Sequence, residues 1–227
     1  MKRTLVMLAA CMFAALSFAM ADNVNIVTTR PTGTDTLIWN QLGAPGTMFG
    51  SPFTATSTNG VVITGNYAAP GGGEVVQEGF NWLGNFAPGD FGIWTTTNPG
   101  NGPLSLSSST GLSEIGAQIQ ADFYGNFTAQ IQAFNGTTLL GTFTENGVSN
   151  GNEDGSAIFL GVQDLSGANI TTIDYSLTSC VLDCTDFAVN QLSLVTGGTT
   201  GTPEPASLIL LGTGLLGLAG AAKRRLS

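Results

Sequence analysis

Few side chains in this sequence could take part in catalysis or metal binding, and histidine, which serves both roles most often, is absent. The chain has 227 residues and no histidine. Nucleophilic sites that depend on a histidine base, and zinc sites with histidine ligands, are therefore excluded within the chain. The 15 acidic residues could include a glycosidase pair, but no spacing selects two of them. We predict that the protein is not an enzyme and has no catalytic residues.

Two cysteines, Cys180 and Cys184, lie outside the N-terminal apolar run. In an exported protein they are expected to form a disulfide. The loop between them is short, so the entropic gain would be small and the bridge would mainly pin the segment before the last strand. A redox or metal-binding pair is the alternative, and the spacing disfavours it because it is not Cys-x-x-Cys.

Candidate binding residues are aromatic. Trp82 and Trp94 lie in a glycine-rich stretch that also contains Phe86 and Phe91. Such rings could stack on sugars, or they could fill a core or cover one end of a sandwich. We name Trp82 and Trp94 as candidate ligand-binding residues.

A polar stretch, Asn150 to Gly155, resembles the first half of a calcium-binding loop. The twelfth position of such a loop would be Gly161, where glutamate is required, so the EF-hand interpretation fails. We predict no metal ligands and no cofactor. A single calcium ion and a plain polar turn both stay open as interpretations of this stretch.

The elements that would position these residues are strands. Short strands are expected at 23–29, 36–40, 61–64, 104–106, 157–162 and 170–177. Apolar and polar residues alternate over 115–123 and 127–133, which predicts two strands with one buried face each. We expect a hairpin between them at Tyr124 to Asn126, and a second one at Asn135-Gly136. The glutamines at 118, 120, 130 and 132 would form an exposed polar face.

Strands of this length between Gly, Pro and Asn turns predict an all-β fold, an antiparallel β-sandwich. We choose a jelly-roll-like, galactose-binding type. The immunoglobulin type is disfavoured because its Cys…Trp…Cys spacing is absent. Near the end of the domain, the burial phase of Phe187 and Val189 differs from that of Leu192 and Leu194. This shift predicts a β-bulge at Asn190-Gln191.

The N-terminus has the layout of a signal peptide, residues 1–21. A basic start precedes an apolar run, and Ala19 and Ala21 satisfy the small-x-small cleavage rule, so the mature chain would begin at Asp22. A rival lipoprotein box, Leu8 to Cys11, would leave an unusually short apolar run upstream. The β-sandwich domain is then expected at 22–195.

The C-terminus has a second targeting layout. A Gly/Thr-rich linker, 196–202, precedes Pro203-Glu204-Pro205, and an uncharged run follows at 206–222. That run is long enough for a short transmembrane helix. The basic residues Lys223, Arg224 and Arg225 would stop transfer and stay cytoplasmic. A plain tail anchor with a proline-rich stop is the alternative.

Together, Pro203-Glu204-Pro205, the glycine-rich apolar run and the terminal basic cluster resemble the PEP-CTERM sorting signal of Gram-negative bacteria. The resemblance implies that an exosortase-type transpeptidase recognises the triplet and removes the helix. It also implies export through the Sec translocon and signal peptidase, and a link to exopolysaccharide. The protein would be a transient inner-membrane precursor and then reach the cell surface, outer membrane or extracellular matrix. Two blocks, Gly116 to Ala121 and Asp154 to Gly161, resemble an ectodomain recurrent in this family, which has no activity to transfer.

The charge of the mature region narrows the choice of partners. Residues 22–202 contain one basic residue, Arg30, against fourteen acidic ones, a net charge of −13. Such a chain is not expected to bind nucleic acid. The first functional hypothesis is an exported, non-enzymatic cell-surface or matrix protein. The alternative is a carbohydrate-binding module, calcium-dependent or not, of the exopolysaccharide matrix.

Overall fold

The computed structural model describes residues 23–32, 35–67, 72–96, 100–181 and 184–197. Both targeting segments lie outside this range. They include the cleavage residues Ala19, Ala21 and Asp22, the triplet Pro203 to Pro205, the expected helix 206–222 and the basic residues Lys223 to Arg225. Within the described ranges, no helix has the length and hydropathy needed to cross a membrane.

One long strand, β8 (Leu104–Ala121), organises the domain because it belongs to two layers. Its first part, up to Ser108, pairs with β5 (Val62–Tyr67) and β12 (Ile170–Cys180). Its second part, from Leu112, pairs with β11 (Ile158–Asp164), β13 (Phe187–Asn190) and β14 (Leu192–Thr196). All the pairings are antiparallel.

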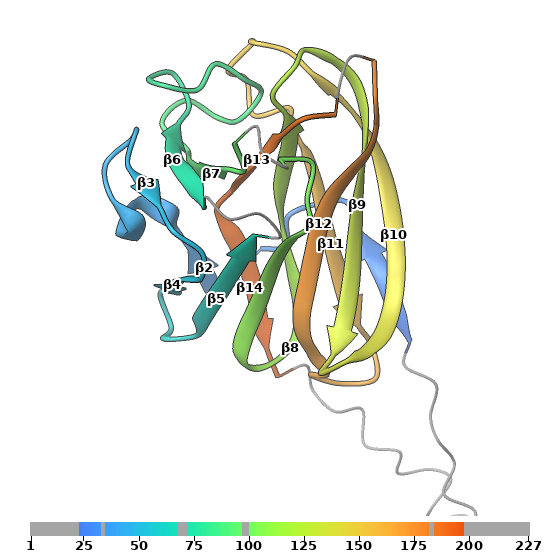
Figure 1. Ribbon diagram of the computed structural model, residues 1–227. Coiled ribbons are helices and arrows are strands. Elements are labelled where there is room, and N and C mark those ends of the chain that lie inside the picture. The colour runs from blue at the N-terminus through green and yellow to red at the C-terminus, as the bar shows by residue number, and fades with distance from the viewer. Residues whose placement is uncertain (1–22, 33–34, 68–71, 97–99, 182–183, 198–227) are drawn as a thin grey trace, which may run out of the picture.

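The remaining strands extend these two layers (Figure 1). The first layer is completed by β4 (Phe53–Thr56) beside β5, and by β9 (Gly125–Asn135) and β10 (Thr138–Ser149) beyond β12. The second layer is completed by five shorter strands, β1 (Val24–Val27), β2 (Asp35–Leu37), β3 (Met48–Phe49), β6 (Gly73–Gln77) and β7 (Phe91–Trp94).

The bend that carries β8 from one layer to the other depends on an irregularity in the strand. Thr172 pairs with Ser107, whereas Ile170 pairs with Leu112, so β8 has extra residues between these positions. Gly111 lies in this bend, and a Cβ atom there would lie 2.1 Å from the Ala168 carbonyl oxygen. Only glycine lets the two backbones approach so closely.

From β8 onward the chain alternates between layers: β9 and β10 lie in the first, β11 in the second, β12 in the first, β13 and β14 in the second. This alternation is the jelly-roll pattern. It confirms the predicted all-β, antiparallel, jelly-roll-like sandwich. The last strand ends at Thr196, one residue beyond the expected domain boundary.

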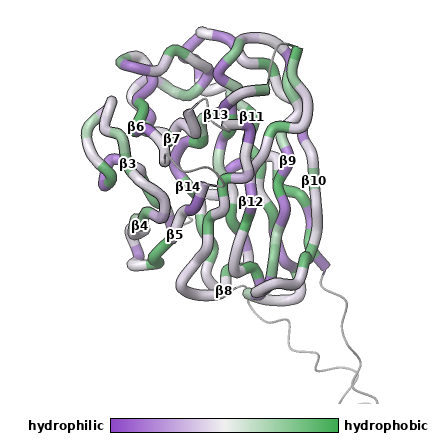
Figure 2. The backbone as a smooth tube through the Cα atoms, viewed as in Figure 1, coloured by the Kyte–Doolittle hydropathy of each residue, from purple (hydrophilic) through white to green (hydrophobic). Residues whose placement is uncertain are grey.

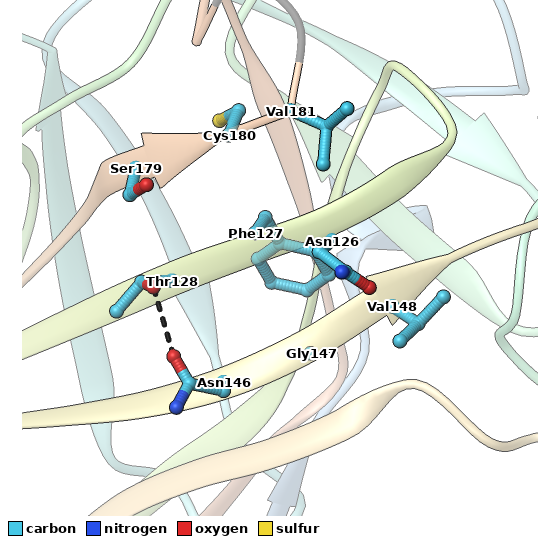
Figure 3. Close-up of a pocket in the computed structure, with 9 residues that line it drawn as sticks. All are labelled: Asn126, Phe127, Thr128, Asn146, Gly147, Val148, Ser179, Cys180 and Val181. Carbon is cyan, nitrogen blue, oxygen red and sulfur yellow. Dashed lines mark hydrogen bonds between the residues drawn. The ribbon is translucent and has the colours of Figure 1, made fainter.

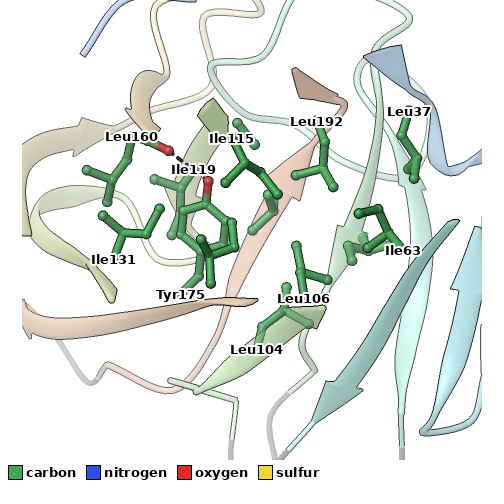
Figure 4. Close-up of a cluster of buried hydrophobic side chains, with 14 of the residues drawn as sticks. Leu37, Ile63, Leu104, Leu106, Ile115, Ile119, Ile131, Leu160, Tyr175 and Leu192 are labelled. Carbon is green, nitrogen blue, oxygen red and sulfur yellow. Dashed lines mark hydrogen bonds between the residues drawn. The ribbon is translucent and has the colours of Figure 1, made fainter. Parts of the chain in front are cut away.

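The main core lies between the layers (Figure 4). Figure 2 shows hydrophobic and hydrophilic residues alternating along β9, whose Phe127, Ala129, Ile131 and Ala133 are buried. Tyr175 of β12 lies fully buried in this core, and its hydroxyl donates a 2.7 Å hydrogen bond to the carbonyl oxygen of Leu160 on β11. This bond links the two layers directly.

The hairpin predicted at Tyr124 to Asn126 is wrong. β8 and β9 do not pair, because β8 lies in the second layer at this point and β9 lies in the first beside β10 and β12. The connection at 122–124 therefore crosses between layers. Period-2 alternation shows that each strand has one buried face, but it does not identify the neighbouring strand. The hairpin predicted at Asn135-Gly136 is confirmed, with Asn135 opposite Thr138.

The bulge predicted at Asn190-Gln191 is confirmed. Val189 pairs with Ile119 and Ser193 pairs with Gly116, so the chain from β13 to β14 has one extra residue relative to β8. The side chain of Asn190 fills the interruption. Its Oδ1 accepts a bond from the backbone N–H of Gln118 (3.0 Å), and its Nδ2 donates to Gln118 Oε1 (2.7 Å).

Two other expectations need correction. Trp39 was expected in a strand, but it begins a short 3-10 helix, Trp39–Leu42, and its indole N–H donates to the Asn190 carbonyl. Gln118 and Gln120 do not form an exposed face: Gln120 is only 1% exposed and Gln118 is half-buried. Loops cover this end of the second layer, and strand alternation gives no information about such covering loops.

The sandwich has two distinct ends. At the lower end in Figure 1, β1 begins and β14 ends. The connections at 78–90, 122–124 and 150–157 lie together at the upper end. We call the upper end the loop end. Thr196 pairs with Leu112, and β8 then runs to Ala121 at the loop end. At about 3.3 Å per residue, this stretch separates the ends by roughly 30 Å.

Candidate functional site

The loop end is built around the segment 78–90, which we call the aromatic loop. Its fold depends on Glu78, a buried residue that follows β6. The Glu78 carboxylate accepts hydrogen bonds from the backbone N–H groups of Gly84 (2.6 Å) and Phe86 (3.0 Å). One side chain thus closes the turn that presents residues 80–83.

Two amide side chains join the aromatic loop to the sandwich. Gln120 Oε1 accepts a bond from the Asn85 N–H (2.7 Å), and Gln120 Nε2 donates to Ser149 Oγ (2.9 Å). The Asn85 side chain in turn donates to the Val148 carbonyl and accepts from the Asn150 N–H. Gly84 allows this close approach, since a Cβ there would lie 2.3 Å from Gln120 Oε1.

The segment 150–157 runs alongside the aromatic loop and supports it. Backbone N–H groups of Glu153 and Ala157 donate to the carbonyls of Gly84 and Asn85. Within the segment, Asn150 Oδ1 accepts from the Asn152 N–H and Asp154 Oδ1 accepts from the Ser156 N–H. This stretch, which resembles a calcium loop in sequence, is thus a polar turn closed by its own side chains. The described ranges contain no group of three or more His, Cys, Asp or Glu side chains able to hold a metal ion.

The two tryptophans named from the sequence mainly form a second, small core. Trp82 is 6% exposed and packs near Phe86 and Trp94, with ring centroids 6.5 and 6.4 Å apart. Val76, Ala157 and Ala188 complete the cluster. Trp82 still lines a surface depression, and Trp94 is not among the residues that line it.

That depression, of about 540 Å³, is the loop-end pocket. It is lined by Asn81, Trp82, Leu83, Asp122, Phe123 and Tyr124. Large apolar side chains stand exposed in and beside it: Phe80 is 73% exposed, Leu83 60%, Tyr124 53% and Phe123 47%. Tyr124 also fixes the aromatic loop, since its hydroxyl donates a 2.7 Å bond to the Leu83 carbonyl.

The pocket has one charged lining residue, Asp122. Its backbone N–H donates to the carbonyl of Asp186, a buried residue before β13. Partial burial, and then the charge of Asp186, raise the pKa of Asp122. Burial also raises the pKa of Asp186. Two carboxylates, one in the pocket lining and one buried, therefore lie close enough to repel each other.

Sequence reasoning missed most of this pocket. Phe123 was assigned to a buried strand face, but β8 ends at Ala121 and Phe123 lies on the surface. The adjacent pair Phe123-Tyr124 before Gly125 was the available signal, because neighbouring strand residues point to opposite faces and cannot both be buried in one core. No sequence feature identified Leu83 and Asn81 as pocket residues, because only the folded loop places them beside Asp122.

The predicted disulfide is confirmed. Cys180 and Cys184 are bonded, with Cα atoms 5.4 Å apart, between the end of β12 and Asp186. Cys180 lines a second depression, of about 430 Å³, on the open face of β9, β10 and β12 (Figure 3). Thr128 Oγ1 donates a 2.9 Å bond to Asn146 Oδ1 within this depression, and its single ring, Phe127, is buried. The loop-end pocket is the better candidate site.

Comparisons with known proteins concern the tail and the overall fold. Residues 202–225 match the PEP-CTERM protein-sorting motif. Among curated proteins no match is found. A solved structure of CsCBM6-3 from Clostridium stercorarium in complex with cellobiose aligns with 73% of this chain and 99% of that chain, at 10% identity and a TM-score of 0.23.

Proposed function

We propose that this chain is a non-enzymatic glycan-binding module of the exopolysaccharide matrix. Residues 202–225 carry the PEP-CTERM protein-sorting motif. This motif implies a secreted, surface-targeted protein with a membrane-anchored precursor and exosortase-type processing. The Sec translocon and signal peptidase export it, and exosortase-type cleavage near Pro205 removes the helix 206–222 together with the basic residues after it. The sandwich then reaches the cell surface, outer membrane or matrix. There the loop-end pocket holds a polysaccharide chain.

The observation that carries this proposal is the exposed aromatic lining of the loop-end pocket. Phe123 and Tyr124 are rings about half exposed to solvent, and Leu83 and the edge of Trp82 continue the apolar surface. Aromatic faces suit the apolar faces of sugar rings. Asn81 and Asp122 in the same lining supply groups for hydroxyls. An exposed patch of this kind on a monomeric domain commonly marks a binding site.

The frame around the pocket is rigid, which favours binding. Glu78, Asn85 and Gln120 are buried and fully engaged with the backbone of the aromatic loop and its neighbours. A pocket that is already formed loses little conformational entropy when a ligand binds. The position of the pocket also favours access by a ligand. The loop end lies opposite the end of β14 at Thr196, after which the sorting tail follows in the sequence.

A glycan array with the mature domain, residues 22–202, tests the proposal. We expect binding to at least one polysaccharide class, with and without a chelator, since no calcium site is part of the pocket. Tyr124→Ala and Phe123→Ala should each lower the affinity by about tenfold, in the range found when a stacking ring is removed. Leu139→Ala is the matched control, because Leu139 is an equally exposed apolar residue at the opposite end.

Two results would overturn the proposal. The absence of binding above background in both conditions would leave only a structural role in the matrix. Turnover of a polysaccharide by the purified domain would make the protein an enzyme.

A further inference from the structure

The charges around the loop-end pocket are of one sign. Asp122 lines the pocket, and buried Asp186 accepts the hydrogen bond of the Asp122 backbone N–H and acts on its carboxylate. Glu74 accepts a 3.1 Å bond from the side chain of Asn81, another lining residue. On the other side of the aromatic loop, Glu153 lies close to Gly79 and to buried Glu78.

No cation offsets these acids. Arg30 is the single basic residue between positions 23 and 197. It donates a 3.2 Å bond to Asn190 Oδ1 and lies over the ring of Phe159, 5.8 Å from its centroid. Its guanidinium is thus held on the second layer, where the charge of Asp90, and not that of Asp122, acts on it.

The pocket therefore combines an aromatic surface with an uncompensated negative potential. Building on the proposed function, we propose that its ligand is a polysaccharide with free amino groups, an amino sugar polymer whose ammonium group pairs with Asp122 while a sugar ring stacks on Phe123 or Tyr124. An acidic polysaccharide is excluded from the same pocket, because its carboxylates would face Asp122 and Asp186. A neutral polymer gains the stacking contact but not the ion pair.

The ammonium group of the ligand would also stabilise the ionised form of Asp122. Asp122 is partly buried and lies near a second carboxylate, so its ionised form is disfavoured in the free protein, as its raised pKa indicates. An ammonium group at the pocket offsets both the desolvation and the repulsion. Rings of the same lining stabilise a cation further when it approaches their faces.

Calorimetry with two matched oligosaccharides tests the inference. One is a glucosamine tetrasaccharide with free amines, and the other is its N-acetylated counterpart, which has the same rings and no charge. We expect the free-amine form to bind about five- to tenfold more tightly at low ionic strength. The difference should shrink at high salt, because screening weakens a partly exposed ion pair.

Variants then assign the effect to the pocket. Asp122→Asn should bring both tetrasaccharides to the same affinity. Glu145→Gln removes the same charge from β10, away from the pocket, and should leave the preference intact. Thermal unfolding of both variants checks that they fold.

The outcomes separate the two proposals. Equal affinity of the native protein for both tetrasaccharides, or a preference that survives Asp122→Asn, would overturn the amino sugar inference and leave glycan binding in place. Tighter binding of a uronic acid oligosaccharide would do the same. A failure of every glycan on the array would overturn the proposed function itself.

Discussion

Tyr175 of β12 donates a buried 2.7 Å hydrogen bond to the Leu160 carbonyl oxygen on β11, and so joins the two layers of the sandwich through the middle of the core. Most side chains of the core between the layers are apolar, so this hydroxyl adds a specific, directional contact to it (Figure 4).

Tyr175→Phe should lower the free energy of unfolding by about 1–3 kcal/mol, because a buried polar partner is lost while the ring still fills its space. Denaturant titration followed by fluorescence measures the change. Tyr124→Phe is the control, since Tyr124 is half exposed and its loss should cost less. Equal effects of the two substitutions would show that the buried bond has no special role.

Stability should rise as pH falls from neutrality toward mildly acidic values. Burial raises the folded-state pKa of Glu78, Glu114, Asp122 and Asp186 above their ordinary values. A carboxyl with a raised folded-state pKa contributes stability that is complete below its unfolded pKa, near 4 (about 3.9 for Asp and 4.3 for Glu), and is lost as pH rises through its folded pKa. Lower net charge at acidic pH acts in the same direction.

Denaturant midpoints at a series of pH values above 4 measure this effect. The double variant Asp122→Asn, Asp186→Asn should show a flatter profile than the native protein. A midpoint that falls steadily on acidification from neutral pH would contradict the prediction.

Gln120→Ala should destabilise the loop end more than any surface substitution. The buried Asn85 N–H would lose its acceptor, at about 1–3 kcal/mol for one unsatisfied group, whereas Ser149 Oγ would lose the bond it accepts and still donate to the Ala121 carbonyl. Gln132→Ala is the matched control, because Gln132 makes only an exposed bond to Thr142 and should change stability by less than about 0.5 kcal/mol. Hydrogen exchange should locate the added opening in residues 78–90, and exchange that stays uniform would argue against a local role.

Replacing both Cys180 and Cys184 by serine should cost about 2 kcal/mol, as the entropy of a loop of this length predicts. The native protein in a reducing buffer should lose the same amount. A larger loss that also abolishes glycan binding would show that the bridge positions Asp186 and the pocket, beyond closing its own short loop.

Pro203→Ala, Pro205→Ala should block processing of the tail. The native protein recovered from cells should have the mass of a chain that starts at Asp22 and ends near Pro205. The variant should stay in the membrane fraction with Lys223 to Arg225 still attached. Thr200→Ala in the linker is the control. Native protein that keeps its basic terminus in the membrane would mean a permanent anchor and would contradict removal by an exosortase.

The sequence by itself determined the C-terminal sorting signal and the class of fold. The triplet at 203–205, the uncharged run and the basic stop are contiguous, so their meaning does not depend on folding. The sequence also predicted the strands at 127–133 and 157–162, the turn at Asn135-Gly136 and the bulge at Asn190-Gln191. Each depends on local alternation or turn chemistry, and the structure confirms them.

Only the tertiary structure decided the partners of the strands and the pocket. Alternation assigns faces but not neighbours, and so β8 and β9 were paired wrongly although they lie in different layers. Alternation also predicted Phe123 in the core and Gln120 on the surface, whereas Phe123 is exposed and Gln120 is buried. The pocket joins Asn81 and Leu83 of the aromatic loop with Asp122 and Tyr124 at the end of β8. These residues are about forty positions apart, and the long-range bonds of Glu78, Asn85 and Gln120 bring them together.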